Sequence, residues 1–445
     1  MTSKPIATAF GLSLFVVLAL AGGAPAAGGT SRVLYRFHGG SDGDSPLSSM
    51  LADKAGNLYG TTFSGGGGAN CSPGCGTVFE LSPPSSPAGA WTERVLYSFK
   101  GGDDGAGPET PLVADRSGNL YGATTQGGIG NCNNEELAGC GTIFELTRPA
   151  APGGAWTESV LYSFQGVPGG QGNGDAAWPN AVVFGPDGSL YGTAYDGGHC
   201  FTDETGTSCY GGAFVLKKPP APGGAWSERV LYRFSGPSGG PASAVLDKAG
   251  NLYGTAQWGA YGFGFVFELS PPQTRDGAWT ESSLYDFQGS GDGAFPLPGL
   301  AFDATGDLYG ASLGPGYGYS NIFELSPSQG GGWTESVLYN FSVIRDGYLP
   351  ATGPILGRNG HLYGTTEEGG RLDRGAVLEL APPGGRDDGW TERVLSSFAG
   401  GSDGFAPYGG LNFGKGGLLY GTTAAGGDLS CGNGNGCGTV FAVVP

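Results

Sequence analysis

The sequence predicts an all-β fold: a seven-bladed β-propeller with four antiparallel strands per blade, closed by the N-terminal strand pairing in the last blade. Three observations predict it: a repeated Leu-Tyr-Gly motif, four strand signals in each repeat, and a repeat split between the two chain ends. The motif tyrosines lie 54 to 70 residues apart and are Tyr59, Tyr121, Tyr191, Tyr253, Tyr309, Tyr363 and Tyr420. Such spacings are typical of propellers and solenoids.

The first repeat shows the four strand signals in order. Residues 50–62 hold two apolar runs around an Asp-Lys-Ala-Gly-Asn segment that favours a hairpin turn. After a Gly-rich loop, residues 76–82 are rich in β-branched and aromatic side chains. Residues 91–99 alternate strictly, with Trp91, Glu93, Val95, Tyr97 and Phe99 on one face. That alternation predicts a half-exposed outer strand, and we name the four strands A to D.

The chain ends predict how the ring closes. The last repeat stops at residues 438–445, which match strand C, while residues 32–37 match part of strand D but precede the first repeat. Pairing of these two segments would leave no open sheet edge, whereas an open solenoid would need polar caps. We therefore expect a signal peptide at 1–27 and one propeller at 28–445. Its repeats lie near 47–99, 111–164, 180–234, 242–287, 297–341, 352–398 and 408–445 plus 32–37.

The repeat also resembles a known family. The runs GNLYGTT, GNLYGAT and GNLYGTA each precede a strand like GTVFEL, and this pattern is similar to the GloVer tandem repeat of secreted bacterial proteins. The resemblance covers the chain after residue 31. It implies an exported, repetitive β protein and assigns no activity to any residue. The third and fifth copies depart most, with GSLYGTA and GDLYGAS.

The N-terminus predicts export. Lys4 precedes an apolar stretch at 6–21 and the small-residue run GGAPAAGG, so cleavage is expected after Ala26 or Ala27. The apolar stretch is short for a membrane span, although a retained anchor is the alternative. We expect a secreted protein, extracellular or periplasmic, with no membrane contact after signal removal.

Charge limits the partners. The chain has 21 Lys and Arg against 39 Asp and Glu, a net charge of −18. Such a surface repels phosphate backbones and anionic lipids, which excludes nucleic acid as a partner. We expect a monomer whose partner is a glycan or an extracellular protein.

The cysteines form four close pairs, each in the predicted loop between strands B and C of blades 1, 2, 3 and 7. The pairs are Cys71 with Cys75, Cys132 with Cys140, Cys200 with Cys209, and Cys431 with Cys437. In an exported protein, local disulfides are expected. The alternative is metal binding, but zinc needs four converging ligands, and pairs on different blades stay apart. We expect no metal held by these cysteines.

The loops between B and C and between D and A share one face, which we call the loop face. Its D–A loops repeat an Asp-Gly pair at Asp42, Asp104, Asp292, Asp346 and Asp403. One interpretation is a turn in which each Asp caps its own backbone. The other is a ring of carboxylates that binds calcium or sugar hydroxyls. No other cofactor is expected.

Two tryptophans depart from the repeat. Six of the eight begin strand D, whereas Trp178 falls in the predicted D–A loop of blade 3 and Trp258 in the predicted B–C loop of blade 4. Aromatic rings beside carboxylates suit stacking on sugar rings. The alternative is packing of both rings against their own blades.

The sequence predicts no catalytic residue. The three histidines lie in different blades, and no GxSxG or HExxH motif is present. The glutamates of WTE and FEL recur too regularly for a unique acid/base pair. The singular carboxyls are Glu367 and Glu368 in blade 6 and Asp203 and Glu204 in blade 3, and the alternative is that both pairs are solvated loop charges. We expect a binding or surface-interaction module, with glycans as candidate ligands. A carbohydrate-active hydrolase or lyase is the alternative, and a structural extracellular protein is a third option.

Overall fold

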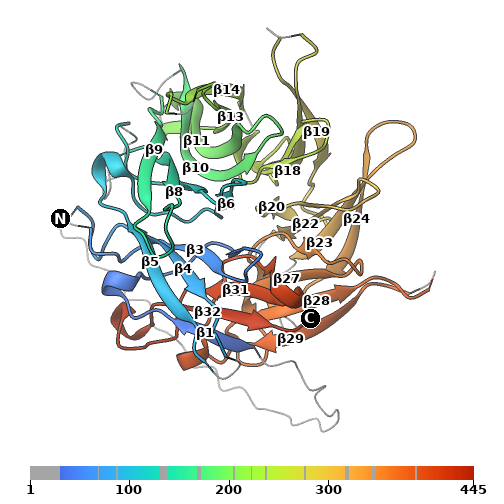
Figure 1. The fold of residues 1–445 in the computed structure, drawn as a ribbon. Coiled ribbons are helices and arrows are strands. Elements are labelled where there is room, and N and C mark those ends of the chain that lie inside the picture. Colours follow the sequence, from blue (N-terminus) through green and yellow to red (C-terminus); the bar gives the residue numbers. More distant parts are fainter. Residues whose placement is uncertain are drawn as a thin grey trace, which may run out of the picture.

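The computed structural model contains seven antiparallel sheets that follow one another around a ring (Figure 1). It describes residues 31–445 except 69, 87–88, 131, 133–138, 168–171, 204–205, 222, 236–237, 275–276, 316–319, 343–346 and 386–387. The predicted signal peptide lies outside the described residues. The described part of the chain contains no helix with the length and hydrophobicity needed to cross a membrane. The predicted seven-bladed propeller is confirmed.

Each blade runs A, B, C, D across its sheet. Blades 1 and 2 contain β2 (Leu51–Ala52), β3 (Leu58–Thr62), β4 (Thr77–Ser82) and β5 (Thr92–Ser98), then β6 (Val113–Ala114), β7 (Leu120–Thr124), β8 (Thr142–Thr147) and β9 (Thr157–Ser163). Blade 3 contains β10 (Gly172–Phe184), β11 (Leu190–Asp203), β12 (Gly206–Cys209), β13 (Gly212–Lys217) and β14 (Ser227–Arg233). Blade 4 contains β15 (Gly239–Pro241), β16 (Val245–Leu246), β17 (Leu252–Trp258), β18 (Phe265–Ser270) and β19 (Thr280–Asp286).

The remaining blades close the ring. Blade 5 contains β20 (Ala294–Pro296), β21 (Ala301–Phe302), β22 (Leu308–Leu313), β23 (Asn321–Pro327) and β24 (Trp333–Asn340). Blade 6 contains β25 (Gly347–Pro350), β26 (Ile355–Leu356), β27 (Leu362–Gly369), β28 (Ala376–Ala381) and β29 (Thr391–Ser397). Blade 7 contains β30 (Asn412–Phe413), β31 (Leu419–Thr423), β32 (Thr439–Val443) and β1 (Arg32–Arg36). Strand β1 pairs antiparallel with β32, Arg32 opposite Ala442, as the chain ends predicted (Figure 1).

The four antiparallel strands predicted for each blade are confirmed, and in six blades strand A has an additional outer part. In blades 4, 5 and 6, strand A consists of two segments that pair with the same strand B, such as β15 and β16 with β17. In blades 1, 2 and 7 the outer segment is reduced to an isolated bridge, such as Asp44 with Ser64. A proline ends the outer segment in blades 4, 5 and 6 and comes two residues after the bridge in blades 1, 2 and 7. Because proline donates no hydrogen bond, the ladder is interrupted there.

The strict alternation predicted for strand D is wrong, because a β-bulge interrupts it. Every blade has a register shift at the same leucine or its equivalent, which in blade 1 is Leu96, between Val95 and Tyr97. The extra residue leaves Leu96 8% exposed and Phe99 fully buried, although they lie three positions apart. This β-bulge turns both side chains inward, because two residues of strand D oppose one of strand C.

Aromatic pairs join neighbouring blades in the core. The Phe after strand D of one blade packs edge-on against the Phe of strand C in the next. The pairs, with centroid distances, are Phe37–Phe79 (5.0 Å), Phe99–Phe144 (5.1 Å), Phe164–Phe214 (5.0 Å), Phe234–Phe267 (5.0 Å), Phe287–Phe323 (5.2 Å) and Phe398–Phe441 (5.0 Å). The strand-C ring also covers the motif glycine of its own blade: a Cβ on Gly60 would lie 2.7 Å from the Phe79 ring. Thus the Gly of Leu-Tyr-Gly makes room for the Phe of strand C.

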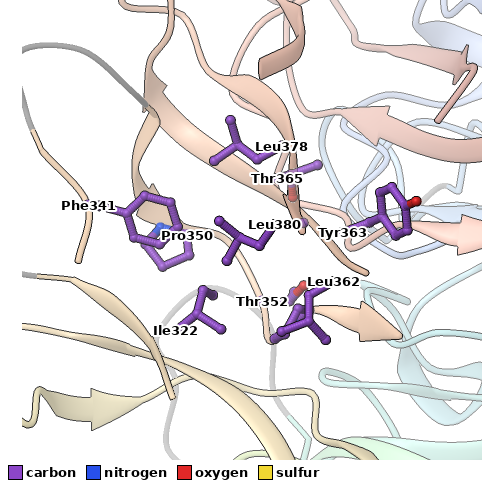
Figure 2. Close-up of a pocket in the computed structure, with 11 residues that line it drawn as sticks. Ile322, Phe341, Pro350, Thr352, Leu362, Tyr363, Thr365, Leu378 and Leu380 are labelled. Carbon is purple, nitrogen blue, oxygen red and sulfur yellow. The ribbon is translucent and has the colours of Figure 1, made fainter. Parts of the chain in front are cut away.

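Blade 6 lacks this ring. Leu378 replaces the strand-C Phe, and a Cβ on Gly364 would meet no atom within 4 Å. The result is a cavity of about 20 Å³ lined by Phe341, Leu378 and Gly364 among others. Figure 2 shows Phe341 and Leu378 at this cavity. Thr365 also lines it, and its buried hydroxyl has no hydrogen-bond partner among the described residues. A Phe-to-Leu difference therefore opens a packing defect between blades 5 and 6.

The repeated tryptophans join blades nearer the opposite face. Each packs against the motif tyrosine of the preceding blade, as in Trp156–Tyr59 (6.4 Å), Trp226–Tyr121 (6.3 Å), Trp279–Tyr191 (6.2 Å), Trp390–Tyr309 (6.4 Å) and Trp91–Tyr420 (6.3 Å). Trp333 lies in the same apolar cluster as Tyr253. These six tryptophans therefore pack between blades.

Candidate functional site on the loop face

A backbone hydrogen bond links neighbouring blades on the loop face, and we call it the interblade latch. The residue before the strand-A proline donates its N–H to a carbonyl in the B–C loop of the preceding blade. The observed pairs are Gly107 with Cys75, Trp178 with Cys140, Gly240 with Tyr210, Phe295 with Phe263, Ala406 with Arg374, and Ser45 with Cys437. The proline then packs over the glycine that follows that carbonyl, so a Cβ on Gly76 would lie 2.5 Å from Pro108.

The latch residues share a left-handed backbone. The φ angles of the latch residues and of Leu349, the equivalent residue in blade 6, lie between 50° and 67°; the residues are Ser45, Gly107, Trp178, Gly240, Phe295, Leu349 and Ala406. Five of the seven are not glycine, and bulky residues rarely adopt positive φ. Backbone strain of this kind persists only where surrounding contacts over-determine it. The latch supplies such contacts and gives the inner edge of the loop face a fixed shape.

Four disulfides hold the B–C loops of blades 1, 2, 3 and 7, as predicted. They join Cys71 to Cys75, Cys132 to Cys140, Cys200 to Cys209, and Cys431 to Cys437. In blade 1 the bridge packs on the D–A loop, because a Cβ on Gly101 would lie 3.0 Å from both sulfurs. Phe263 in blade 4 and Arg374 in blade 6 lie against the equivalent glycines, Gly289 and Gly400. The position against the D–A loop glycine is therefore occupied by a disulfide, an aromatic ring or an arginine in different blades.

The disulfides limit metal binding in blade 3. Ligand atoms of Asp196, Cys200 and Cys209 lie within 4.8 Å of one another. Both sulfurs belong to the bridge and are not available as thiolates. Asp196 accepts a hydrogen bond from the Gly197 N–H.

Four of the five predicted aspartates hold their own D–A loop. The Asp42 carboxylate accepts from the His38 N–H at 3.0 Å and the Tyr35 hydroxyl at 2.8 Å. Equivalent backbone donors are Lys100 to Asp104 (2.7 Å), Gln288 to Asp292 (2.7 Å) and Ala399 to Asp403 (2.9 Å). The geometry is that of a turn cap. Asp346 lies outside the described residues, and calcium binding at the other four stays a prediction.

Sequence reasoning missed a sixth member of this set. Asp175 accepts from the Tyr162 hydroxyl at 2.8 Å and the Gln165 N–H at 2.9 Å. Ala176 follows it in place of Gly, so the Asp-Gly pattern did not include it. The tyrosine before the loop Asp was the signal that could have found it.

A second row of carboxyls lies behind these aspartates. Burial, and then the charge of the nearby loop Asp, raises the pKa of Glu93, Glu158, Glu228 and Glu335 to about 7. Within the described residues, one oxygen of each is buried without a hydrogen-bond partner. These WTE glutamates recur because they belong to the blade interfaces, so they are not a unique catalytic pair.

The two singular tryptophans differ from their predicted positions. Trp178 lies inside strand β10 as a latch residue, half-buried, and Trp258 is the last residue of β17. Both loop assignments were wrong, because strands A and B extend further toward the loop face than the apolar pattern indicated. No ring contact joins Trp178 to Trp258 among the described residues. Of the two, Trp258 is the more exposed, at 47%.

Trp258 belongs to an aromatic cluster across blades 4 and 5. Its ring packs edge-on against Phe295 at 5.9 Å, and Phe263 lies 6.2 Å from the same Phe295 ring. Tyr261, 61% exposed, follows in the same loop. Beside them the Tyr195 hydroxyl donates to Gln257 Oε1 at 3.2 Å. The latch fixes Phe295 and therefore the wall against which Trp258 stands.

A separate pair of carboxyls lies in blade 6. Burial chiefly raises the pKa of Glu367 to about 7, while a hydrogen bond from Tyr408 opposes the rise. Glu368 lies opposite Tyr348 in the β25–β27 ladder. In blade 2, burial likewise raises the pKa of Glu109, which follows the latch proline Pro108. Glu109 was missed because its position in the repeat is variable.

A sequence comparison assigns the family. The model of the Gloeobacter/Verrucomicrobia repeat matches residues 24–216 and 129–358. The chain belongs to this repeat family. The GloVer resemblance is thereby confirmed, and no curated protein matches the sequence.

Solved structures resemble this family member only distantly. A protein from Lactobacillus plantarum is 16% identical, with 78% of this chain and 84% of that chain covered and a TM-score of 0.49. A PQQ-bound aldose sugar dehydrogenase from Streptomyces coelicolor is 14% identical, with 95% and 100% covered and a TM-score of 0.43. A gluconolactonase from Xanthomonas campestris is 14% identical, with 68% and 79% covered and a TM-score of 0.36. Likenesses of this degree carry no information on activity.

Proposed function

We propose that this repeat protein binds carbohydrate through its loop face. The observation that carries the proposal is the exposed pair Trp258 and Tyr261, which stands on a wall fixed by Phe295 and its latch. Exposed aromatic rings offer flat apolar area at low cost in conformational entropy, which suits the flat face of a sugar ring. Rings held on rigid strands keep that orientation before the ligand arrives.

Polar groups beside the rings support the same function. Gln257 accepts the Tyr195 hydroxyl through Oε1, and within the described residues its amide nitrogen has no protein partner. That amide is free to donate to a sugar hydroxyl. Loop aspartates such as Asp292 use some of their lone pairs on their own turns and keep others for hydroxyls or for a bridging calcium ion.

An enzyme is the second candidate because of blade 6. A carboxyl with a pKa of about 7, as at Glu367, is suited to general acid catalysis near neutral pH. The Tyr408 beside it is 44% exposed, so the pair is open to a ligand. Glycoside hydrolysis needs a second carboxyl within about 10 Å. Glu368 is adjacent in sequence.

Export belongs to the proposal as well. Four disulfides are typical of proteins from oxidising compartments, extracellular or periplasmic. Fractionation of cells that express the full chain tests it: recovery of the protein in the cytoplasm with eight free thiols would contradict export.

The test measures binding and cleavage together. Purified protein is titrated with a panel of soluble polysaccharides, with and without calcium, and reducing ends are counted. We expect retention of at least one polysaccharide and about tenfold weaker binding by Trp258→Ala, a loss of roughly 1.4 kcal/mol. Leu372→Ala, which removes another exposed side chain from a loop of the same face, is the control. Reducing-end release that disappears in Glu367→Gln would instead establish the enzyme.

A further inference from the structure

The face that carries the A–B and C–D connections also has a recess. It lies between blades 1 and 2, encloses about 460 Å³, and is lined by Arg94, Arg148, Tyr59, Glu80 and Trp156 together with the loop 149–153. We call it the arginine groove. Recesses of this size are typical of small-molecule sites. It lies on the face opposite to Trp258, so the proposed function does not use it.

The groove keeps positive charge inside an acidic protein. The Arg94 guanidinium donates to the carbonyls of Gly153 at 3.2 Å and Gly154 at 2.5 Å, and these neutral acceptors position it without cancelling its charge. Arg148 has no carboxylate within 4 Å among the described residues. Glu80 is the one lining carboxylate, and it accepts the Tyr59 hydroxyl at 3.2 Å. Two cations therefore face one anion.

This charge pattern departs from the repeat. In blade 6 the equivalent of Arg94 is Arg393, which donates to Glu379 Oε2 at 2.6 Å and is neutralised by it. The equivalents of Arg148 in blades 1, 4, 5 and 6 are prolines, namely Pro83, Pro271, Pro327 and Pro382. The repeat does not need two arginines at this place, so their meeting between blades 1 and 2 has no common structural cause.

We propose that the arginine groove binds a uronate, the carboxylate form of an acidic sugar unit. The guanidinium of Arg148 is planar and pairs with a carboxylate through two parallel hydrogen bonds. Trp156 presents a partly exposed ring for the sugar face, and Glu80 with Tyr59 offers partners for hydroxyls. Because Glu80 opposes a doubly charged anion, the groove favours a monovalent carboxylate over a phosphate.

The test compares charged and neutral sugars. Isothermal titration of the full chain with galacturonate and glucuronate, against galactose and glucose, is expected to give at least about tenfold tighter binding of one uronate. Arg148→Gln should remove that preference, and Arg148→Lys should restore it only in part. Arg229→Gln is the matched control, because Arg229 is the blade 3 equivalent of Arg94 and the next blade has Pro271 at the position of Arg148 instead of a second cation. Raising the salt concentration should weaken uronate binding.

Several outcomes would overturn the proposal. They are equal affinity for a uronate and its neutral parent, tight uronate binding that survives Arg148→Gln, tighter binding of inorganic phosphate than of any uronate, or no uronate binding at about 10 mM. Trp258→Ala separates the two faces, because it should leave uronate binding at the groove unchanged. A failure of the loop-face proposal is therefore distinguishable from a failure of this one.

Discussion

At the scale of single residues, one side chain explains the packing defect of blade 6. Six blades place a Phe ring over the motif glycine, while Leu378 in blade 6 leaves the space above Gly364 empty. Phe341, which lacks a strand-C Phe to pack against, is 7% exposed, whereas its six equivalents are fully buried. The difference is visible in the sequence as LEL in place of FEL. The cavity that results could not be predicted from it, because the cavity depends on how blades 5 and 6 pack together.

Leu378→Phe should fill this cavity. We expect the free energy of unfolding to rise by about 1 kcal/mol, because buried apolar area and ring contacts are gained without loss of a hydrogen bond. Thermal unfolding measures it, and the reverse change, Phe323→Leu in blade 5, should cost a similar or larger amount. A lower melting temperature for Leu378→Phe would show that the cavity is too small for the ring.

At the scale of elements, strands and loops were predicted unequally. The Asp-Lys-Ala-Gly-Asn turn and strands B and C follow from local sequence, and the Asp53 carboxylate accepts the Gly56 and Asn57 N–H groups as such a turn requires. The bulge at Leu96 and the left-handed Trp178 were not predicted, because both are imposed by contacts with a neighbouring strand or blade. Register and latch geometry are tertiary properties, and local pattern does not contain them.

The blade 1 disulfide should stabilise the protein modestly. Replacement of Cys71 and Cys75 by Ser removes the covalent loop that restricts the unfolded chain. Because this loop is short, we expect the free energy of unfolding to fall by only ~2 kcal/mol. Denaturant unfolding measures it. Since the bridge packs on Gly101 in the D–A loop, its loss should also weaken binding of the polysaccharide that the wild type retains. Reduced stability with unchanged affinity would instead show that the bridge has a structural role alone.

At the scale of the whole molecule, the ring was predicted and the sites were predicted only in part. The split repeat predicted ring closure by β1, because the last repeat lacks a strand D and residues 32–37 match that strand. The loop face was correctly expected to carry the disulfides, while Trp258 was assigned to a loop and is the last residue of strand β17. The arginine groove was missed because residues from variable repeat positions meet there across blades 1 and 2. Glu109 was missed because its position in the repeat is variable.

The buried glutamates should make stability depend on pH. Glu93, Glu158, Glu228 and Glu335 have folded pKa values of about 7, above the ordinary 4.5, so the folded state binds more protons between these values. Stability from these groups is therefore full below about pH 4.5 and is lost as pH rises to about 7. We expect a higher melting temperature at pH 5 than at pH 8. Glu158→Gln should flatten this profile by roughly 1 kcal/mol, and a profile that rises toward pH 8 would contradict it.

Ring closure should be essential for cooperative unfolding. Deletion of residues 1–37 removes β1 and leaves β32 as an open edge in blade 7. We expect a loss of several kcal/mol and a tendency to associate, seen by calorimetry and by size-exclusion chromatography. Deletion of residues 1–30 alone is the control, and equal stability of the two truncated chains would refute closure by β1.

The most direct test of the central claim, that the loop face binds carbohydrate, is one comparison of affinities. Wild-type protein, Trp258→Ala and Leu372→Ala are titrated with the polysaccharide that the wild type retains best. We predict that Trp258→Ala binds about tenfold more weakly while Leu372→Ala binds as the wild type does. Equal affinity of all three proteins, or no retention of any polysaccharide by the wild type, would contradict carbohydrate binding at this face.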